Sequence, residues 1–383
     1  MAKKKLIVVW PYRFREFDWQ RFELEQLSQH AEVHVHELID ALTPEFAAAY
    51  ANQSERPEVK RFGSLKEWRR EFKRVSKDSI VFTHVRPTNL KSTLICLSVR
   101  RASKKAIGFA TGGAPNYASV GEVHGLEIRQ MFRHLYHRLK RNFLASAAPK
   151  KILVGGFEEE KRVRRDFAKR VMLIPGSSSD HSQTLLKERY GDEHQNIAIF
   201  LDTGFPGFLR DELLTGIREP VNPSDWYPRL LNFFAEVDRE LKIETVVAVH
   251  PKHVGRDHSV FFGERKIIGD QTMRLVSSAR LVIATNSTSI SYAVTYCKPL
   301  ILVTCDAIEE SRQRKKLEIR NCGIETGATV FNIDRQYTAQ ELRDALVIDH
   351  AKRESYKRKY LTSRIDDKPN YQVLLDEVIN AVD

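Results

Sequence analysis

Residues 241–304 read LKIETVVAVHPKHVGRDHSVFFGERKIIGDQTMRLVSSARLVIATNSTSISYAVTYCKPLILVT, and this stretch decides the fold. Three runs rich in β-branched residues, Val246–Val249, Leu281–Ala284 and Leu300–Val303, are separated by segments of helical character. Such alternation is typical of a parallel α/β sheet. Polar residues directly follow the first two runs, and open α/β sheets bind their ligands at the carboxyl ends of strands. The stretch therefore predicts a Rossmann-like sheet and the place of its site.

The same alternation continues on both sides of this stretch. Further strand candidates are Leu6–Trp10, Glu32–His36, Ser79–Thr83, Ala106–Ala110, Lys151–Val154, Asn196–Leu201 and Ala328–Phe331. We expect helices from about Asp18 to His30 and from about Tyr371 onward. The sequence predicts an α/β protein with two Rossmann-like doubly wound domains that face a cleft. The expected boundaries are residues 1–175 for the first domain, 176–195 for a linker that begins in IPGSSSD, 196–350 for the second domain and 351–383 for a C-terminal helical segment.

Composition limits the class of protein. The chain has 383 residues, of which 42% are hydrophobic and 29% are charged, as in ordinary globular proteins. No run of about 18 apolar residues could span a bilayer, and the start MAKKKLIVVW lacks the features of a signal peptide. We therefore expect a cytoplasmic protein. The four cysteines, Cys96, Cys297, Cys305 and Cys322, have no metal-ligand spacing, and we interpret them as reduced residues in or near the core.

The net charge of +12 is partly local. Residues 129–170 contain thirteen Lys or Arg and four acidic residues, which favours an anionic partner. Within this segment, apolar side chains recur at helical spacing between Phe132 and Phe143. A basic amphipathic helix of this kind fits peripheral contact with an anionic membrane surface, but a helix packed on its own domain has the same pattern. Both interpretations remain open.

Two polar clusters follow the strands of the opening stretch. The segment Asn286-Ser287-Thr288-Ser289 offers hydroxyl and backbone donors at the expected start of a helix, which suit a phosphate, although the same residues are common N-caps. His250-Pro251-Lys252 follows the neighbouring strand and adds an imidazole and an ammonium group. Because neither a Walker loop nor Gly-x-Gly-x-x-Gly after the first strand is present, a P-loop NTPase or a classical dehydrogenase is disfavoured.

These motifs resemble the nucleotide-binding half of GT-B glycosyltransferases that use CMP-activated acidic sugars. His250-Pro251 and Ser287-Thr288 are similar to the His-Pro and Ser-Ser/Thr motifs of bacterial sialyltransferases. The series His-Pro-Lys, TNSTSIS and Cys297-Lys298-Pro299-Leu300 resembles the β-Kdo transferases of capsule and lipopolysaccharide synthesis more closely. The resemblance covers about 110 residues, Asn196 to Asp306. It implies that the first domain binds the acceptor, that the second binds the nucleotide sugar, and that the two motifs hold the phosphate and ribose of CMP.

A carboxylate is expected at the end of the first strand of the second half. Kdo-type enzymes have a nucleophilic aspartate there, and the resemblance places Asp202 in that role, before the loop Gly204–Gly207. The alternative is that Asp202 only caps a turn. The Asp/Glu-Asp/Glu-Gly base motif of sialyltransferases is missing, which favours the Kdo-like assignment.

The N-terminal half offers candidates for a base and for acceptor contacts. Glu122, His124 and Glu127 follow the loop that contains Gly112 and Gly113, and each is a candidate base, an acceptor contact or a structural residue. Arg86, Gly112 and Gly113 are the expected acceptor-binding residues, and Arg13 is a further cation at a strand end.

Three functions compete. The first is a glycosyltransferase that moves Kdo or a nonulosonic acid from its CMP ester to a bacterial surface polysaccharide, with no cofactor, no metal and no nucleic-acid partner. The second is a CDP-polyol phosphotransferase of the teichoic-acid or capsule type. Those enzymes usually have another histidine in the N-terminal half, for which His84 and His124 are candidates. The third is a non-enzymatic basic nucleic-acid-binding protein, which only the positive charge supports. The first is our working hypothesis.

Overall fold

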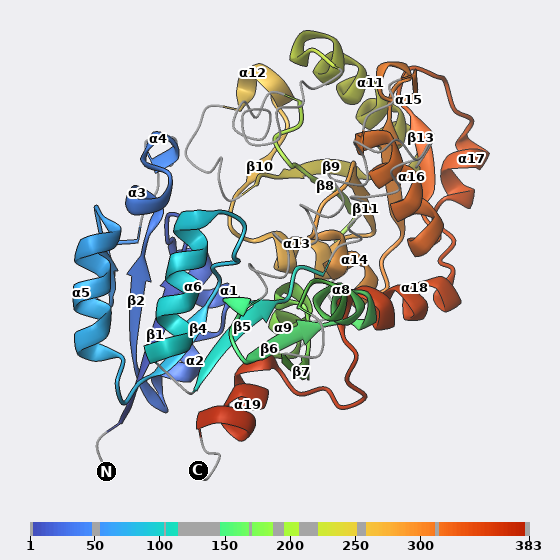
Figure 1. Ribbon diagram of the computed structural model, residues 1–383. Coiled ribbons are helices and arrows are strands. Elements are labelled where there is room, and N and C mark those ends of the chain that lie inside the picture. Colours follow the sequence, from blue (N-terminus) through green and yellow to red (C-terminus); the bar gives the residue numbers. More distant parts are fainter. Residues whose placement is uncertain are drawn as a thin grey trace, which may run out of the picture. The chain divides into compact units, whose positions relative to one another are not determined.

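The structure is a computed structural model that describes residues 3–47, 54–102, 105–113, 146–167, 171–186, 195–206, 221–250, 258–310 and 314–379. The chain divides into two compact units. The first comprises residues 1–112, 119–183 and 362–383, and the second comprises residues 113–118 and 184–361. Each unit is built on its own parallel sheet (Figure 1).

The first unit contains a seven-stranded sheet with the order β3-β2-β1-β4-β5-β6-β7. Its strands are β1 (Lys4–Trp10), β2 (Ala31–Glu37), β3 (Val59–Arg61), β4 (Ile80–Thr83), β5 (Ala106–Ala110), β6 (Lys151–Gly155) and β7 (Met172–Gly176). Its helices are α1 (Glu16–Arg21), α2 (Leu24–Ser28), α3 (Ile39–Leu42), α4 (Pro44–Ala47), α5 (Leu65–Val75), α6 (Leu90–Ala102), α8 (Phe157–Phe167), α9 (Ser179–Leu186, which extends past the unit boundary), α19 (Asn370–Leu374) and the π-helix η3 (Leu375–Ile379).

Strand β1 shows why this sheet is covered on both faces. Leu6, Val8 and Trp10 belong to one apolar cluster, whereas Ile7 and Val9 belong to another. Successive side chains of a strand point to opposite faces, so a strand that is apolar throughout needs helices on both sides. The run LIVVW therefore specifies a central strand of a doubly wound sheet.

The second unit contains a six-stranded sheet with the order β10-β9-β8-β11-β12-β13. Its strands are β8 (Ile197–Leu201), β9 (Glu244–Ala248), β10 (Ile267–Ile268), β11 (Leu281–Ala284), β12 (Leu300–Thr304) and β13 (Thr329–Asn332). Its helices are α11 (Pro223–Leu241), α12 (Ser259–Phe262), α13 (Thr272–Ser278), α14 (Ile290–Thr295), α15 (Asp306–Glu310), α16 (Arg314–Thr326), α17 (Ala339–Asp344), α18 (His350–Tyr356) and the π-helix η2 (Lys357–Leu361). All strand pairs of both sheets are parallel.

The predicted fold class is confirmed, because both sheets have the strand order of a doubly wound Rossmann-like domain. The central strands were predicted to within a few residues. The edge strands β3, β7 and β10 were not, because they are short or only partly buried and carry little apolar signal. Cys96, Cys305 and Cys322 are buried free thiols as expected, whereas Cys297 is exposed.

The expected helix from Asp18 to His30 is divided into α1 and α2. Glu23 lies between them in the left-handed region, with φ of 57°. An apolar pattern continues through this position, so the break was not visible in the sequence. It places the Glu23 side chain inside the first unit, where only 1% of the residue is exposed.

The stretch 176–195, expected to be a linker, contains helix α9. Gly176 ends β7 in close packing, since an added Cβ would lie 2.6 Å from Leu153 Cδ1 and 2.9 Å from Asn370 Oδ1. The glycine that suggested a flexible turn is therefore needed for the close approach of the C-terminal segment.

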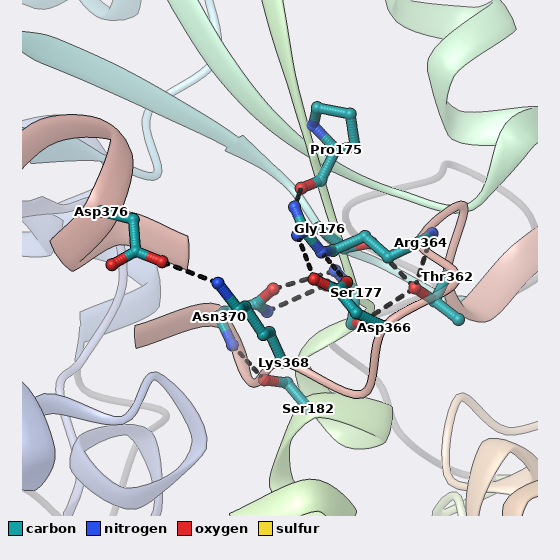
Figure 2. Close-up of polar contacts among 10 residues, drawn as sticks. All are labelled: Pro175, Gly176, Ser177, Ser182, Thr362, Arg364, Asp366, Lys368, Asn370 and Asp376. Carbon is teal, nitrogen blue, oxygen red and sulfur yellow. Dashed lines mark hydrogen bonds and ion pairs between the residues drawn. The ribbon is translucent and has the colours of Figure 1, made fainter. Parts of the chain in front are cut away.

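The C-terminal residues pack on the first unit through this region (Figure 2). The Asn370 side chain accepts from Ser177 N at 2.8 Å and donates to Ser177 O at 2.9 Å. Asn370 N donates to Ser182 Oγ at 2.7 Å, and Thr362 Oγ1 donates to Gly176 O at 3.2 Å. Residues 186 to 193 positions apart thus form one buried polar cluster.

Glu23 completes this cluster. Ser182 Oγ donates to one carboxylate oxygen, and Tyr371 N donates to the other at 2.6 Å. Burial disfavours the charged form and raises the pKa of Glu23 to about 7, although the hydrogen bonds from Ser182 and Tyr371 oppose this rise. The cluster is therefore sensitive to pH.

We predict that ionisation of Glu23 destabilises the first unit. Its folded-state pKa lies above the usual 4.5, so its contribution to stability is complete below pH 4.5 and is lost as the pH rises through about 7. A rise of this size corresponds to about 3 kcal/mol. In thermal unfolding from pH 5 to 8, Glu23→Gln should lose less stability than the wild-type protein, whereas the exposed control Glu55→Gln should follow the wild type. Parallel pH profiles for all three proteins would contradict this assignment.

Candidate functional site

The site in the second unit lies where the winding of the sheet reverses. From β8 the chain proceeds to β9 and β10 on one side, and then to β11, β12 and β13 on the other. The loops after β8 and β11 therefore separate at a topological switch point, where open α/β sheets bind ligands. Thr203 and Thr285 mark this point, with their hydroxyl oxygens 3.5 Å apart.

Asp202 follows β8 at this position and is 5% exposed. Its Oδ1 accepts from Gly204 N at 2.8 Å, so the turn-capping interaction considered for this residue is present. Burial, with a smaller contribution from the Asp202 carboxylate, raises the pKa of Tyr227 on α11. The bond to Gly204 fixes the orientation of the carboxylate, and its role as a nucleophile stays a prediction.

The segment after β11 brings the second polar cluster to the same edge. Ser287 Oγ accepts from Ser289 N at 3.2 Å, and α14 begins only at Ile290. Ser289 therefore occupies the N-cap position, but its side chain makes no capping bond. Among the described residues, the exposed Thr288 hydroxyl has no hydrogen-bond partner. Ser287 therefore makes a local bond of the capping kind, which was the alternative to ligand binding, whereas the hydroxyls of Thr288 and Ser289 make no capping bond.

Helix α16 contributes two residues that the sequence did not indicate. Glu318 Oε2 accepts from Asn286 Nδ2 at 2.6 Å, and Lys315 Nζ lies 4.3 Å from the centroid of the Phe205 ring. One face of α16 therefore contacts the loops after β11 and β8. The charged segment around these residues carries no motif, so only the tertiary contact identifies them.

Of the predicted motif His250-Pro251-Lys252, the described residues include His250. His250 lies two residues beyond β9, the other neighbour of β8. It thus follows a strand adjacent to that of Asp202, as expected. Pro251 and Lys252 lie outside the described residues, as does Gly207.

The first unit has a switch point between β1 and β4. Arg86 follows β4, and Gly112 and Gly113 follow the adjacent strand β5. Arg86 is bonded to Glu159 at 3.3 Å, and Gly113 has φ of 68°. Arg13 was proposed as a cation for ligands, but it is held by Glu37 and Asp40 at 2.6 and 3.1 Å.

Glu122, His124 and Glu127 lie outside the described residues, together with the basic segment around Phe132 to Phe143.

His84 at the end of β4 has a distinct environment. Its ring centroid lies 4.7, 4.3 and 4.5 Å from those of Trp10, Phe22 and Phe109. Although the residue retains some accessible surface, desolvation by these rings lowers the pKa of His84 to about 3, and the charges of Arg86 and Arg21 add to this effect. The imidazole is therefore neutral at physiological pH.

Solved structures with the same fold were found by structural comparison. Two variants of the wall teichoic acid polymerase TagF align with 98% and 99% of this chain and 88% and 90% of their own, with TM-scores of 0.54 and 0.53 and identities of 10% and 11%. A UDP-N-acetylglucosamine 2-epimerase aligns with 99% of this chain and 96% of its own, with a TM-score of 0.50 and 11% identity.

The chain has a GT-B-type fold. At these identities the likeness extends to the fold alone. No protein-family model matches the sequence, and no curated protein matches it significantly. Of the helices in the described part of the chain, none is long and apolar enough to cross a bilayer.

The turn after β8 provides a prediction about Asp202. Asp202→Ala should lower the free energy of unfolding by about 1 kcal/mol, because Gly204 N–H loses its acceptor. Asp202→Asn should lose less, since its amide oxygen can accept the same bond. Urea unfolding of the three proteins measures the difference, and equal losses in both variants would show that this bond does not stabilise the turn.

Proposed function

We propose that the protein is a glycosyltransferase that moves a 2-keto sugar acid, Kdo or a nonulosonic acid, from its CMP ester to a bacterial surface-polysaccharide acceptor. The observation that carries the proposal is the arrangement at the switch point of the second sheet. There a buried, oriented carboxylate follows β8, and hydroxyl groups follow the neighbouring strand β11. A GT-B-type fold is consistent with a nucleotide-sugar substrate at this edge.

The proposed chemistry is a double displacement. The Asp202 carboxylate attacks the anomeric carbon, and the bond from that carbon to the phosphate oxygen breaks as CMP leaves. An acceptor hydroxyl then attacks the glycosyl enzyme, loses its proton to a base and restores the carboxylate. His250, Lys252, Ser287 and Thr288 would offset the charge that develops on the leaving phosphate.

The first experiment is a thermal-shift panel with CMP, CDP, UDP, GDP and ADP. A ligand at about 100 times its dissociation constant stabilises a protein by roughly 2.7 kcal/mol, so occupancy of a true site is measurable. We expect selective stabilisation by CMP. A response to UDP or GDP instead would reject the proposed donor. No response to any nucleotide, together with salt-dependent binding of nucleic acid, would favour the non-enzymatic alternative.

The second experiment tests Asp202 in transfer assays with CMP-Kdo and CMP-nonulosonic acid donors. Asp202→Asn keeps an acceptor for Gly204 N–H but removes the charge, so we expect the loss of nearly all transfer with little change in CMP affinity. His250→Ala should instead weaken CMP binding, because the phosphate loses a hydrogen-bond donor. An Asp202→Asn variant with full transfer activity would exclude a nucleophilic role.

The second candidate function is a CDP-polyol phosphotransferase. His84 favours it, because such enzymes were expected to have a histidine in the N-terminal half, and the lowered pKa of this imidazole keeps it neutral at physiological pH. TagF structures with TM-scores of 0.53 and 0.51, from crystals soaked with CDPG, share the fold.

Transfer of labelled glycerol phosphate from CDP-glycerol separates the two candidates. The acidic-sugar proposal predicts that the wild-type protein transfers no glycerol phosphate. It also predicts that His84→Gln lowers the rate of CMP-sugar turnover by no more than about tenfold. If His84 is instead the base of a phosphotransferase, labelled glycerol phosphate will be transferred by the wild-type protein and His84→Gln will lose roughly a hundredfold or more in rate.

A further inference from the structure

The orientation of the Asn286 amide is determined by its partner on α16. Asn286 follows β11 by two residues, and its Nδ2 donates to Glu318 Oε2 at 2.6 Å. The carboxylate oxygen of Glu318 is the acceptor of this bond, so the amide nitrogen of Asn286, not its oxygen, faces Glu318. The reverse orientation would place two acceptors in contact. The Asn286 carbonyl oxygen therefore points away from Glu318.

That carbonyl oxygen has no hydrogen-bond partner in the described part of the chain. Asn286 Oδ1 is buried, and no hydrogen-bond donor reaches it from the described residues. A buried acceptor without a partner destabilises the protein, and a hydrogen bond from a ligand donor would remove that cost. The phosphodiester of a CMP-sugar offers only acceptor oxygens and cannot supply this donor. The nucleoside can, through its ribose hydroxyls or the amino group of cytosine.

Helix α16 is suited to hold Glu318 in place. Ile319, the next residue, is fully buried in the core of the second unit. Lys315 lies one turn earlier and contacts Phe205 in the loop after β8. Positions i and i+3 share one face of a helix, so Lys315 and Glu318 face the same edge of the sheet.

We infer that the Asn286 carbonyl oxygen accepts a hydrogen bond from a hydroxyl or amino group of the nucleoside and does not contact the phosphate. Glu318 is a positioning residue that fixes the orientation of this carbonyl. The inference rests on the proposed function, because it assigns a role within the same nucleotide site. It narrows the expectation for Asn286, which had been grouped with Ser287 and Thr288 as residues that hold the phosphate and ribose of CMP.

The test is a double-mutant cycle of binding affinities measured by calorimetry. The proteins are the wild type, Asn286→Ala, Glu318→Ala and the double variant, with Glu325→Gln on the same helix as a control. The ligands are CMP, 2′-deoxy-CMP, 3′-deoxy-CMP and UMP. We expect each single substitution to weaken CMP binding about tenfold, which is the size of one lost hydrogen bond to a buried group. The double variant should bind no more weakly than Asn286→Ala, because Glu318 acts through Asn286.

The ligand series identifies the donor. If Asn286 accepts from a ribose hydroxyl, one deoxynucleotide will bind the wild type about tenfold more weakly than CMP, and Asn286→Ala will not distinguish the two. If it accepts from cytosine, UMP will show this behaviour instead. If Asn286→Ala lowers the binding affinity of all four ligands equally, the inference is wrong and Asn286 acts on the phosphate that the ligands share. Additive losses in the double variant would overturn the positioning role of Glu318.

A measurement without ligand separates this inference from the proposed function. In protein labelled with ¹⁵N-asparagine, the Asn286 side-chain amide should shift in Glu318→Gln and remain unchanged in Glu325→Gln. If the shift is present but no nucleotide binds, the proposed function is wrong, and so is the proposed hydrogen bond between Asn286 and a nucleoside. The hydrogen bond between Asn286 and Glu318 would still be confirmed. If nucleotides bind but the amide does not respond, the positioning role fails alone.

Discussion

The central position of β8 in the second sheet is the constraint on which the candidate site depends. Backbone hydrogen bonds join β8 to β9 on one side and to β11 on the other. Because these strands are parallel, their carboxyl ends meet at one edge, and the reversal of winding leaves the loops after β8 and β11 free to separate. Asp202, His250 and Asn286 thus reach the same edge from distant positions in the sequence.

Burial gives the polar groups of the first unit unusual properties. Glu23 accepts hydrogen bonds from Ser182 and Tyr371, and burial raises its pKa to about 7. His84 is packed among aromatic rings, which lower its pKa to about 3. In both cases loss of water favours the neutral form. The first group joins the C-terminal segment to its unit, and the second presents a neutral imidazole at a strand end.

Much of the sheet architecture was predictable because buried parallel strands have a strong apolar signal. Ala106–Ala110 and Leu281–Ala284 were predicted at their observed bounds. The edge strand Val59–Arg61 and the break at Glu23 were not, because an edge is partly polar and a single left-handed residue leaves an apolar pattern intact. The positions of Asp202 and of Ser287 to Ser289 after apolar runs indicated polar groups at strand ends. Residue type and the order of residues along the chain are enough to predict that position.

The sequence by itself determined the two doubly wound sheets and which polar residues follow their strands, because strand burial and turn chemistry are local properties. Only the tertiary structure decided which distant groups touch those residues. Glu318 lies 32 positions after Asn286, and Asn370 lies 193 positions after Ser177. Such contacts arise from the packing of helices on sheets, and no periodicity or motif along the chain records them. The partners that orient a site therefore appear only when the chain is folded.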